Sequence, residues 1–309
     1  MNAFLHTPAR ISLAAVVAAG LLTGCSPSAD ARGADATQTA TIASAPASID
    51  LSAELEQLES ESDARIGVSA FDTGTGQTVS YGADDRFGFA SSFKAFVAGG
   101  FLLAVPVAER DTVVTWTQED IDAAGYSPIT SEHISDGLTL SQLAEAAVRA
   151  SDNTATNIIL RRIGGPAGLQ EILRQAGDNT SQIVNYEPDL NIIEPGSTDD
   201  TTTPAAFAAG IGAFLTGTVL AASDKAMLME WMSGNPSGDP LIRAGAPEGW
   251  TVADKSGGAY GIRNDIAIIT PPDREPIILT ILTLKNAPDA EYENATVADT
   301  AKVVLDALK

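Results

Sequence analysis

The spacing of hydrophobic residues predicts a helix followed by a β-hairpin at the start of the folded part. Leu51, Leu55 and Leu58 recur at helical intervals among acidic residues, which indicates an amphipathic helix. Apolar and polar residues then alternate over residues 65–72, and after a glycine-containing turn residues 78–81 run back. Alternation on both sides of a short turn is typical of two paired strands.

A long stretch with helical spacing comes next, from residue 91 to about residue 239. Its clearest apolar stripe contains five residues on one helix face: Leu140, Leu143, Ala144, Ala147 and Val148. A helix opening at residue 91 is apolar nearly all round, so we expect it to be buried. Further helices are expected at residues 157–163, 166–176, 204–215 and 224–231.

Strand patterns return after residue 247, and they decide the fold class. Three strands are expected at residues 250–255, 265–269 and 277–284, with turns at 257–258 and 271–272 and a final helix at 297–308. The order predicts an α+β fold. One five-stranded antiparallel sheet carries the terminal helices, and a mostly helical second domain is inserted between its strands.

The domain boundaries follow from this order. Residues 50–88 and 247–309 are expected to form the sheet domain, and residues 89–246 the helical domain. We expect a cleft where the two domains meet, because ligand sites commonly lie at domain junctions.

The amino-terminal segment has the features of an export signal. The apolar run of residues 11–24 is too short to span a bilayer but suits the core of a signal peptide. It ends in Leu-Thr-Gly before Cys25, which resembles the lipobox of bacterial lipoproteins. This resemblance implies removal of residues 1–24 and a lipid anchor on Cys25; the alternative is an ordinary secretory signal. Residues 25–49 are small and polar, and they predict a disordered tether.

Composition excludes several function classes. The 309 residues include 40 acidic and 18 basic side chains, for a net charge of −22. This acidic excess argues against binding to nucleic acid and against adsorption to anionic lipid. The single cysteine and two histidines leave neither a disulfide framework nor the ligand set of a zinc hydrolase. A Ser-His-Asp triad would have to use His133.

Ser91 and Lys94 are the first candidate pair. They lie three residues apart at the start of the buried helix, so they share a helix face. Burial would lower the pKa of the Lys94 ammonium and make it usable as a base for the Ser91 hydroxyl. Such a spacing also occurs wherever a serine caps a surface helix, so the pair alone does not establish a site.

Two further motifs lie later in the chain. Ser151 and Asn153 fall in a break between two helices, where they could either cap a helix or point into a cleft. Lys255 and Ser256 precede Gly257 and Gly258 at a predicted strand end, and glycines let a backbone approach a ligand closely. An ordinary strand-to-turn junction would have the same composition.

Together and in this order, the three motifs resemble those of the penicillin-recognising serine hydrolases. A Glu-x-x-x-Asn stretch from Glu187 to Asn191, in a polar loop at about residues 182–202, narrows the resemblance to the class A serine β-lactamases. The similarity extends over residues 50–309, and Tyr126 lies in a segment similar to the family's cleft edge.

The resemblance implies a role for each residue. Ser91 would attack the lactam carbonyl, with the backbone N–H groups of Ser91 and Gly258 holding the oxyanion. Ser151 would pass a proton to the leaving nitrogen, and Glu187 with Asn191 would activate the deacylating water. Whether Lys94 or Glu187 activates Ser91 is open. The residues implied to bind substrate are Tyr126, Asn153, Lys255, Ser256, Gly257 and Arg263.

The resemblance further implies small-molecule β-lactam substrates, no cofactor and no metal, a monomer, and an exported, anchored enzyme. One position departs from the family pattern: Asn185 stands where an arginine usually pairs across the loop with an aspartate, here Asp200. This predicts a looser loop. Three alternatives remain, namely a D-alanyl-D-alanine peptidase, a penicillin-binding sensor that stays acylated, and a solute-binding lipoprotein.

Overall fold

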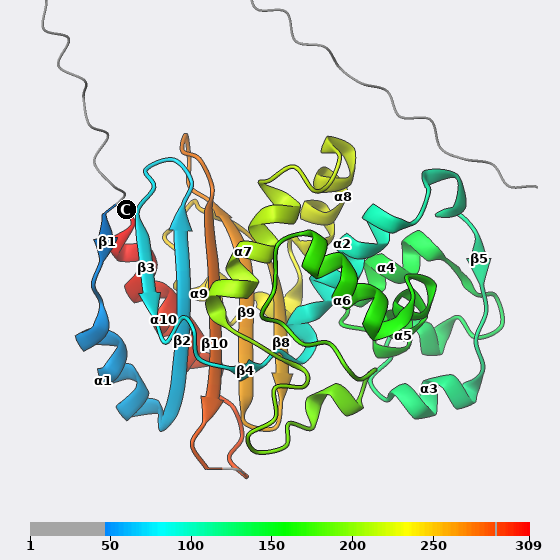
Figure 1. Cartoon of the computed structure of the whole chain (residues 1–309), viewed down its shortest axis with the longest axis horizontal. Coiled ribbons are helices and arrows are strands. Elements are labelled where there is room, and N and C mark those ends of the chain that lie inside the picture. Colours follow the sequence, from blue (N-terminus) through cyan, green and yellow to red (C-terminus); the bar gives the residue numbers. More distant parts are fainter. Residues whose placement is uncertain (1–46, 288) are drawn as a thin grey trace, which may run out of the picture. The chain divides into compact units, whose positions relative to one another are not determined.

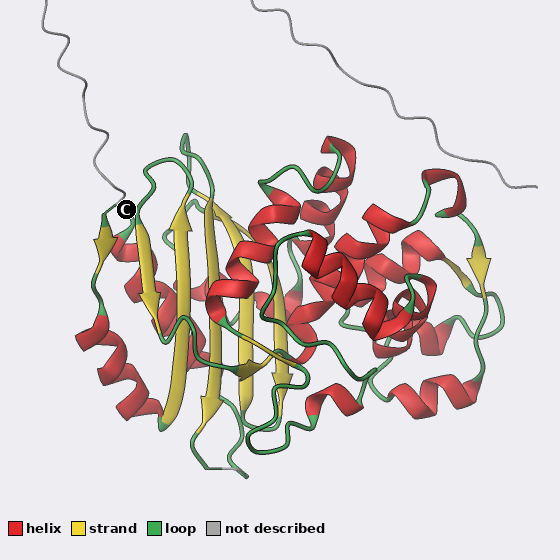
Figure 2. Ribbon diagram, viewed as in Figure 1, coloured by secondary structure: helices red, strands yellow, loops and turns green. Residues whose placement is uncertain are grey.

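The structure, a computed structural model of the chain, describes residues 47–287 and 289–309. The predicted signal peptide, the proposed attachment residue Cys25 and the tether up to residue 46 lie outside the described residues. The described part combines one large sheet with a group of helices beside it, in agreement with the predicted α+β class (Figures 1 and 2).

The large sheet contains the five predicted strands and a sixth one. Its order is β1-β3-β2-β10-β9-β8, and every pairing among the predicted five is antiparallel. The strand bounds are Ser48–Ile49 (β1), Ala64–Asp72 (β2), Thr78–Tyr81 (β3), Thr251–Ala259 (β8), Ile262–Thr270 (β9) and Ile277–Lys285 (β10). The two residues of β1, which the sequence analysis assigned to the tether, pair in parallel with β3.

Helices cover both faces of this sheet. α1 (Ser52–Ser62) and α10 (Asn294–Ala307) pack on one face, and α7 (Pro204–Leu215) packs on the other (Figure 1). β10 is therefore apolar on both sides. Ile277, Leu279 and Ile281 join the core under α10, whereas Ile278 joins the core under α7. Burial of both faces explains why this strand is a continuous apolar run.

The helical part lies between β4 (Phe87–Gly88) and β8 in the chain. Its helices are α2 (Lys94–Ala104), α3 (Gln118–Ala124), α4 (Leu140–Arg149), α5 (Asn153–Arg162), α6 (Gly165–Gln175), α8 (Ala222–Met232) and α9 (Ile242–Gly245). Short 3₁₀ turns are η1 (Ala90–Phe93), η2 (Val107–Glu109), η3 (Thr130–Glu132), η4 (Asp189–Asn191) and η5 (Pro236–Gly238). The pairs β4 (Phe87–Gly88) with β7 (Thr201–Thr202), and β5 (Val113–Val114) with β6 (Leu138–Thr139), were not predicted, since two-residue strands leave no alternation to detect.

The predicted turn at Gly257 and Gly258 is wrong. Both glycines continue β8 and pair with Asn264 and Arg263 of β9, and the chain turns only after Ala259. A Cβ on Gly257 would lie 2.8 Å from both the Phe89 carbonyl oxygen and the Ser92 nitrogen. Glycine is needed here because β8 passes very close to η1, not because the chain reverses.

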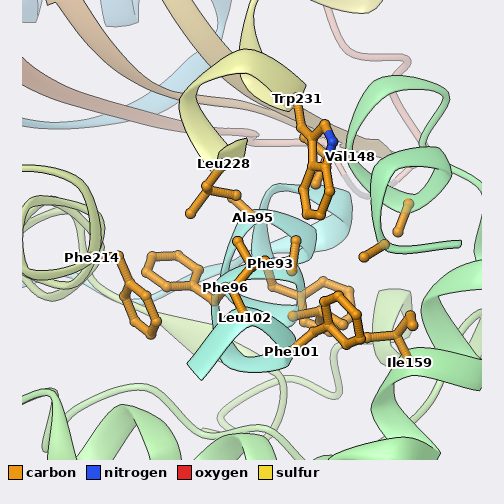
Figure 3. Packing of buried hydrophobic residues seen from close by; sticks show 14 of the residues in the cluster. Phe93, Ala95, Phe96, Phe101, Leu102, Val148, Ile159, Phe214, Leu228 and Trp231 are labelled. Atoms are coloured by element: carbon orange, nitrogen blue, oxygen red, sulfur yellow. The ribbon is translucent and has the colours of Figure 1, made fainter. Parts of the chain in front are cut away.

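α2 forms the centre of the main hydrophobic core, as its apolar sequence predicts. Figure 3 shows its side chains surrounded by residues of several other helices, among them Trp231 of α8 and Ile159 of α5. The Phe96 ring lies 4.7 Å from that of Phe207 and 6.1 Å from that of Phe214, between centroids. This packing fixes the helix that carries Lys94 at its first residue.

Replacement of Phe96 should therefore destabilise the whole fold. We expect Phe96→Ala to lower the free energy of unfolding by about 3–5 kcal/mol, because it removes a buried ring and leaves a cavity. Leu103→Ala on the same helix is the matched control, since Leu103 is 42% exposed and should cost far less. Urea unfolding followed by circular dichroism measures both. Equal losses for the two variants would contradict the packing described.

Candidate active site

The junction of η1 and α2 places Ser91 and Lys94 side by side. Ala90 has the left-handed backbone angle φ +43°, which turns the chain from β4 into η1. Lys94 is fully buried, and its ammonium has three acceptors: Glu187 Oε1 at 3.0 Å, the Ser151 carbonyl oxygen at 2.8 Å and Asn153 Oδ1 at 2.5 Å. These are the three shortest of its contacts, and together they satisfy the three hydrogens of the ammonium group. Burial nevertheless lowers the pKa of Lys94, against the opposing attraction of Glu187.

Glu187 reaches this cluster from the 182–202 loop. The side-chain amide of Asn157 in α5 forms two hydrogen bonds with the backbone of Glu187. Asn157 Nδ2 donates to the Glu187 carbonyl at 2.8 Å, and Asn157 Oδ1 accepts from the Glu187 N–H at 3.0 Å. The carboxylate then accepts from the Ser91 hydroxyl at 3.3 Å and from Asn191 Nδ2 at 2.7 Å. Glu187 is thus a buried carboxylate in contact with the candidate nucleophile, its lysine and an amide.

Ser151 lies between the two buried lysines. Its hydroxyl oxygen accepts from Lys94 Nζ at 3.4 Å and from Lys255 Nζ at 3.3 Å. Ser151 has φ +55°, an uncommon angle for a residue with a side chain, and one that often marks a functional site. The neighbouring Asp152 caps α5 by accepting from the Ala155 N–H, so the break between α4 and α5 combines a cap with a site residue.

Lys255 lies on β8 and is as well buried as Lys94. It donates to the Ser256 carbonyl oxygen at 2.8 Å, in addition to its contact with Ser151. Burial, together with repulsion from Lys94, lowers the pKa of Lys255 to about 7. The charge of this side chain therefore changes close to neutral pH, which suits a group that binds and releases an anion.

Arg263 lies on β9 and pairs with Gly258 of β8, the strand that carries Lys255. Its Nε donates to Asn294 Oδ1 at 2.8 Å, and its guanidinium stacks over the Tyr292 ring at 4.9 Å from the centroid. Burial lowers the pKa of Arg263. The two contacts hold the guanidinium in a fixed orientation, next to the Gly257 carbonyl oxygen at 3.4 Å.

These residues surround a cavity of about 610 Å³ between the sheet edge and the helices. The predicted residues that line it are Ser91, Tyr126, Ser151, Asn153, Glu187, Asn191, Ser256, Gly258 and Arg263. Lys94, Lys255 and Gly257 lie directly behind them, while Cys25 lies outside the described residues. His133 is not among the lining residues.

Sequence reasoning missed four polar or aromatic residues of the site. Arg149, Ser237 and Tyr292 line the cavity, and Asn157 holds Glu187 from behind. Ser237 accepts from the Ser256 hydroxyl at 3.0 Å, between oxygens. None of these residues belongs to a recognisable motif, because each comes from a segment brought in only by the tertiary fold.

Asn185 retains a link to Asp200 across the loop. Its Nδ2 donates to Asp200 Oδ2 at 2.6 Å, and the N–H groups of Val184 and Asn185 donate to Asp200 Oδ1 at 2.9 and 3.1 Å. The Asp200 carboxylate thus accepts three hydrogen bonds in place of the arginine ion pair that this chain lacks. These bonds join the two ends of the loop.

Within residues 47–287 and 289–309, no group of three or more His, Cys, Asp or Glu side chains is placed to hold a metal ion. In the same part of the chain, every helix is too short or too polar to cross a bilayer.

Comparisons with known proteins show which family the chain belongs to. The model of the "Beta-lactamase enzyme family" matches residues 50–308. "Beta-lactamase 3" of Bacillus cereus is 48% identical over 254 residues, 82% of this chain and 80% of that protein. A β-lactamase of Bacillus subtilis is 45% identical over 254 residues, 82% of each chain. The crystal structure of a class A β-lactamase from Clostridium kluyveri superposes with a TM-score of 0.81 at 44% identity, over 83% of this chain and 97% of that one.

Proposed function

This chain belongs to the class A serine β-lactamases, and we propose that its cleft opens the β-lactam ring through an ester on Ser91 that water then hydrolyses. The protein is a hydrolase of the cyclic amide of β-lactam antibiotics, an activity that confers resistance. What remains to be assigned is which residue performs each step.

Formation of the ester begins at Ser91. The Ser91 proton passes into the buried Lys94–Glu187 pair, both members of which lie beside the hydroxyl. The oxygen attacks the lactam carbonyl, and the N–H groups of Ser91 and Gly258 stabilise the negative charge that develops. One such donor contributes roughly 2.7–4 kcal/mol to lowering a barrier of this kind. Ser151 then delivers a proton to the ring nitrogen as the C–N bond breaks, supported by its contacts with both lysines.

Release of the ester depends on Glu187. Its carboxylate lies 3.3 Å from the Ser91 hydroxyl oxygen and accepts a hydrogen bond from Asn191, so a water bound beside the carboxylate would lie close to the ester carbonyl and could be deprotonated for the attack. This short separation is the observation that carries the proposal. It favours a hydrolase over a penicillin-binding sensor, which would lack a base poised beside the ester.

Substrate binding uses the cationic part of the cleft. Lys255, Ser256 and Arg263 would hold the substrate carboxylate, and they form a positive spot in a chain of net charge −22. Asn153 Nδ2 donates one hydrogen to the Ala124 carbonyl, so its second hydrogen can reach the substrate side-chain amide. Tyr126, which is largely exposed, would flank the entrance, and Gly257 allows β8 to approach η1.

The amino-terminal segment indicates where in the cell the protein lies. We propose that the chain is exported and held at the cell membrane by lipid on Cys25, with residues 26–46 as a spacer and the enzyme acting as a monomer. Two acyl chains on one cysteine suffice for stable attachment, whereas a single chain gives only marginal binding.

Glu187→Ala should separate the two chemical steps. We expect one burst of product with a chromogenic cephalosporin, then a stall, with steady-state turnover reduced about 10²–10⁴-fold because the general base is gone. Asp199→Ala, an exposed acid in the same loop, should turn over normally. Stopped-flow absorbance resolves the burst. A single burst by the unmodified chain would instead indicate a sensor, and preference for acyl-D-Ala-D-Ala peptides a peptidase.

Lys255 should give the reaction an alkaline limit. With a pKa of about 7, Lys255 is charged below that pH and neutral above it, so kcat/KM for an anionic β-lactam should fall as pH rises through about 7. Lys255→Arg keeps its charge at all these pH values and should move the fall to higher pH, whatever its absolute rate. An alkaline limb at the same pH in both proteins would rule Lys255 out as its source.

The anchor can be tested by cell fractionation. In cells expressing the full chain, β-lactamase activity should sediment with membranes, and Cys25→Ser should lose the acyl chains and release the activity. Ser28→Ala serves as the control and should stay with the membranes. Equal release of both variants and of the unmodified chain would mean that the signal is an ordinary secretory one.

A further inference from the structure

A second cavity shares Asn191 with the cleft. It has a volume of about 740 Å³ and lies between residues 191–198 of the loop, β4, and the turn that joins β8 to β9. We call it the rear pocket. Its size is that of a pocket that binds a small organic molecule. It has no part in the proposed reaction, yet it touches a residue that holds Glu187.

The body of the rear pocket is apolar. Ile193 of the loop and Ile262 of β9 meet over Gly88, where a Cβ would lie 2.8 Å from Ile262 Cδ1 and 2.9 Å from Ile193 Cγ1. Ile192 and Tyr260 also line the pocket and are 57% and 69% exposed. Apolar side chains gathered around a hollow, with two of them facing water, mark a binding surface more often than isolated exposed residues do.

Basic side chains outnumber acidic ones in the lining of the rear pocket, the opposite of the ratio in the whole chain. Three basic side chains line it, Arg65, Arg86 and Lys285, against the single acid Glu194. In the whole chain, acids outnumber bases 40 to 18. Among the lining residues the bases therefore exceed the acids, although Arg65 and Lys285 also contact Asp85 and Glu293 outside the lining, and such an excess is complementary to an anion.

Arg65 is the base best placed to turn toward a ligand. Arg86 donates to Thr201 Oγ1 at 2.8 Å and to the Thr180 carbonyl oxygen at 2.8 Å. Lys285 donates to the Ser62 carbonyl oxygen at 2.6 Å and pairs with Glu293 Oε1 at 3.1 Å. Arg65 stacks over the Phe87 ring at 4.8 Å and meets Asp85 only at 3.5 Å, in a solvent-exposed pair. Exposed pairs of this kind are weak, so an incoming anion can compete for the guanidinium.

We propose that the rear pocket binds small amphipathic organic anions, with an aromatic or alkyl body against Ile193 and Ile262 and a carboxylate or sulfonate on Arg65. Binding acts on the reaction through the loop. Asn191 lines both cavities and donates to Glu187 at 2.7 Å, so an occupant that shifts residues 191–193 loosens the hold on the carboxylate. This second part rests on the proposed role of Glu187 in deacylation.

A fluorescent anion tests the site directly. The probe is 1-anilinonaphthalene-8-sulfonate, an aromatic sulfonate that brightens in apolar surroundings, titrated into the full chain. We expect saturable binding that Arg65→Gln weakens at least tenfold and Thr198→Trp, which fills the pocket from its exposed rim, abolishes. Arg162→Gln is the matched control, since Arg162 is equally exposed and pairs with Glu109 on the surface, and it should bind as the unmodified chain does. Binding indifferent to Arg65→Gln and Thr198→Trp would overturn the site.

Turnover measured with and without the probe tests the coupling. We expect a saturating probe to lower kcat at least threefold, with kcat/KM changed less than twofold, and Thr198→Trp to be insensitive. Competition with the β-lactam would place the probe in the cleft and overturn the proposal. Binding with kcat unchanged would overturn the coupling. The fluorescence does not depend on which residue deacylates the enzyme. If the probe still binds and Glu187→Ala turns over at the normal rate, the proposed role of Glu187 is wrong and the proposed pocket is not.

Discussion

A buried ammonium in contact with a buried carboxylate determines how this part of the chain is arranged. Lys94 and Glu187 lie 3.0 Å apart and are both buried, and removal of either partner would leave an uncompensated charge in the interior. Each charge therefore needs further polar partners, and the whole cluster comes from three separate segments. α2 carries the lysine, the 182–202 loop carries the carboxylate, and the break between α4 and α5 carries the additional partners Ser151 and Asn153. Because the buried charges need partners from all three segments, the segments come together, and the cleft lies where they meet.

The same arrangement adapts an acidic protein to an anionic substrate. Burial lowers the pKa of both Lys94 and Lys255, and that of Lys255 falls to about 7, so Lys255 can exchange its proton near neutral pH, which an exposed lysine cannot do. Close packing enforces that burial. Gly257 lets β8 run against η1, which brings Lys255 within reach of Ser151, and the aromatic core around Phe96 holds α2 in place. The positions of the catalytic groups therefore depend on the packing of the hydrophobic core.

Much of the fold and of the site could be predicted from local sequence. The five main strands and the longer helices follow from periodicity, whereas α3 and α9 were not predicted. The motifs around Ser91, Ser151, Glu187 and Lys255 meet at one cavity. Errors arose where tertiary contacts decide. Gly257 and Gly258 were expected in a turn but extend a strand, because the reason for glycine there is a neighbour distant in sequence. Asn157 and Tyr292 belong to no motif, and their contribution is visible only after the chain has folded.

The central claim is that Glu187 stands ready beside Ser91 to complete hydrolysis. A high-resolution crystal structure of the unliganded enzyme tests it most directly. The account predicts an ordered water bound by Glu187, Asn191 and the Ser91 hydroxyl, with Lys94 Nζ about 3 Å from the carboxylate. A Glu187 side chain turned to solvent, with no ordered water between it and Ser91, would contradict the account and leave a protein able to capture β-lactams but not to hydrolyse them.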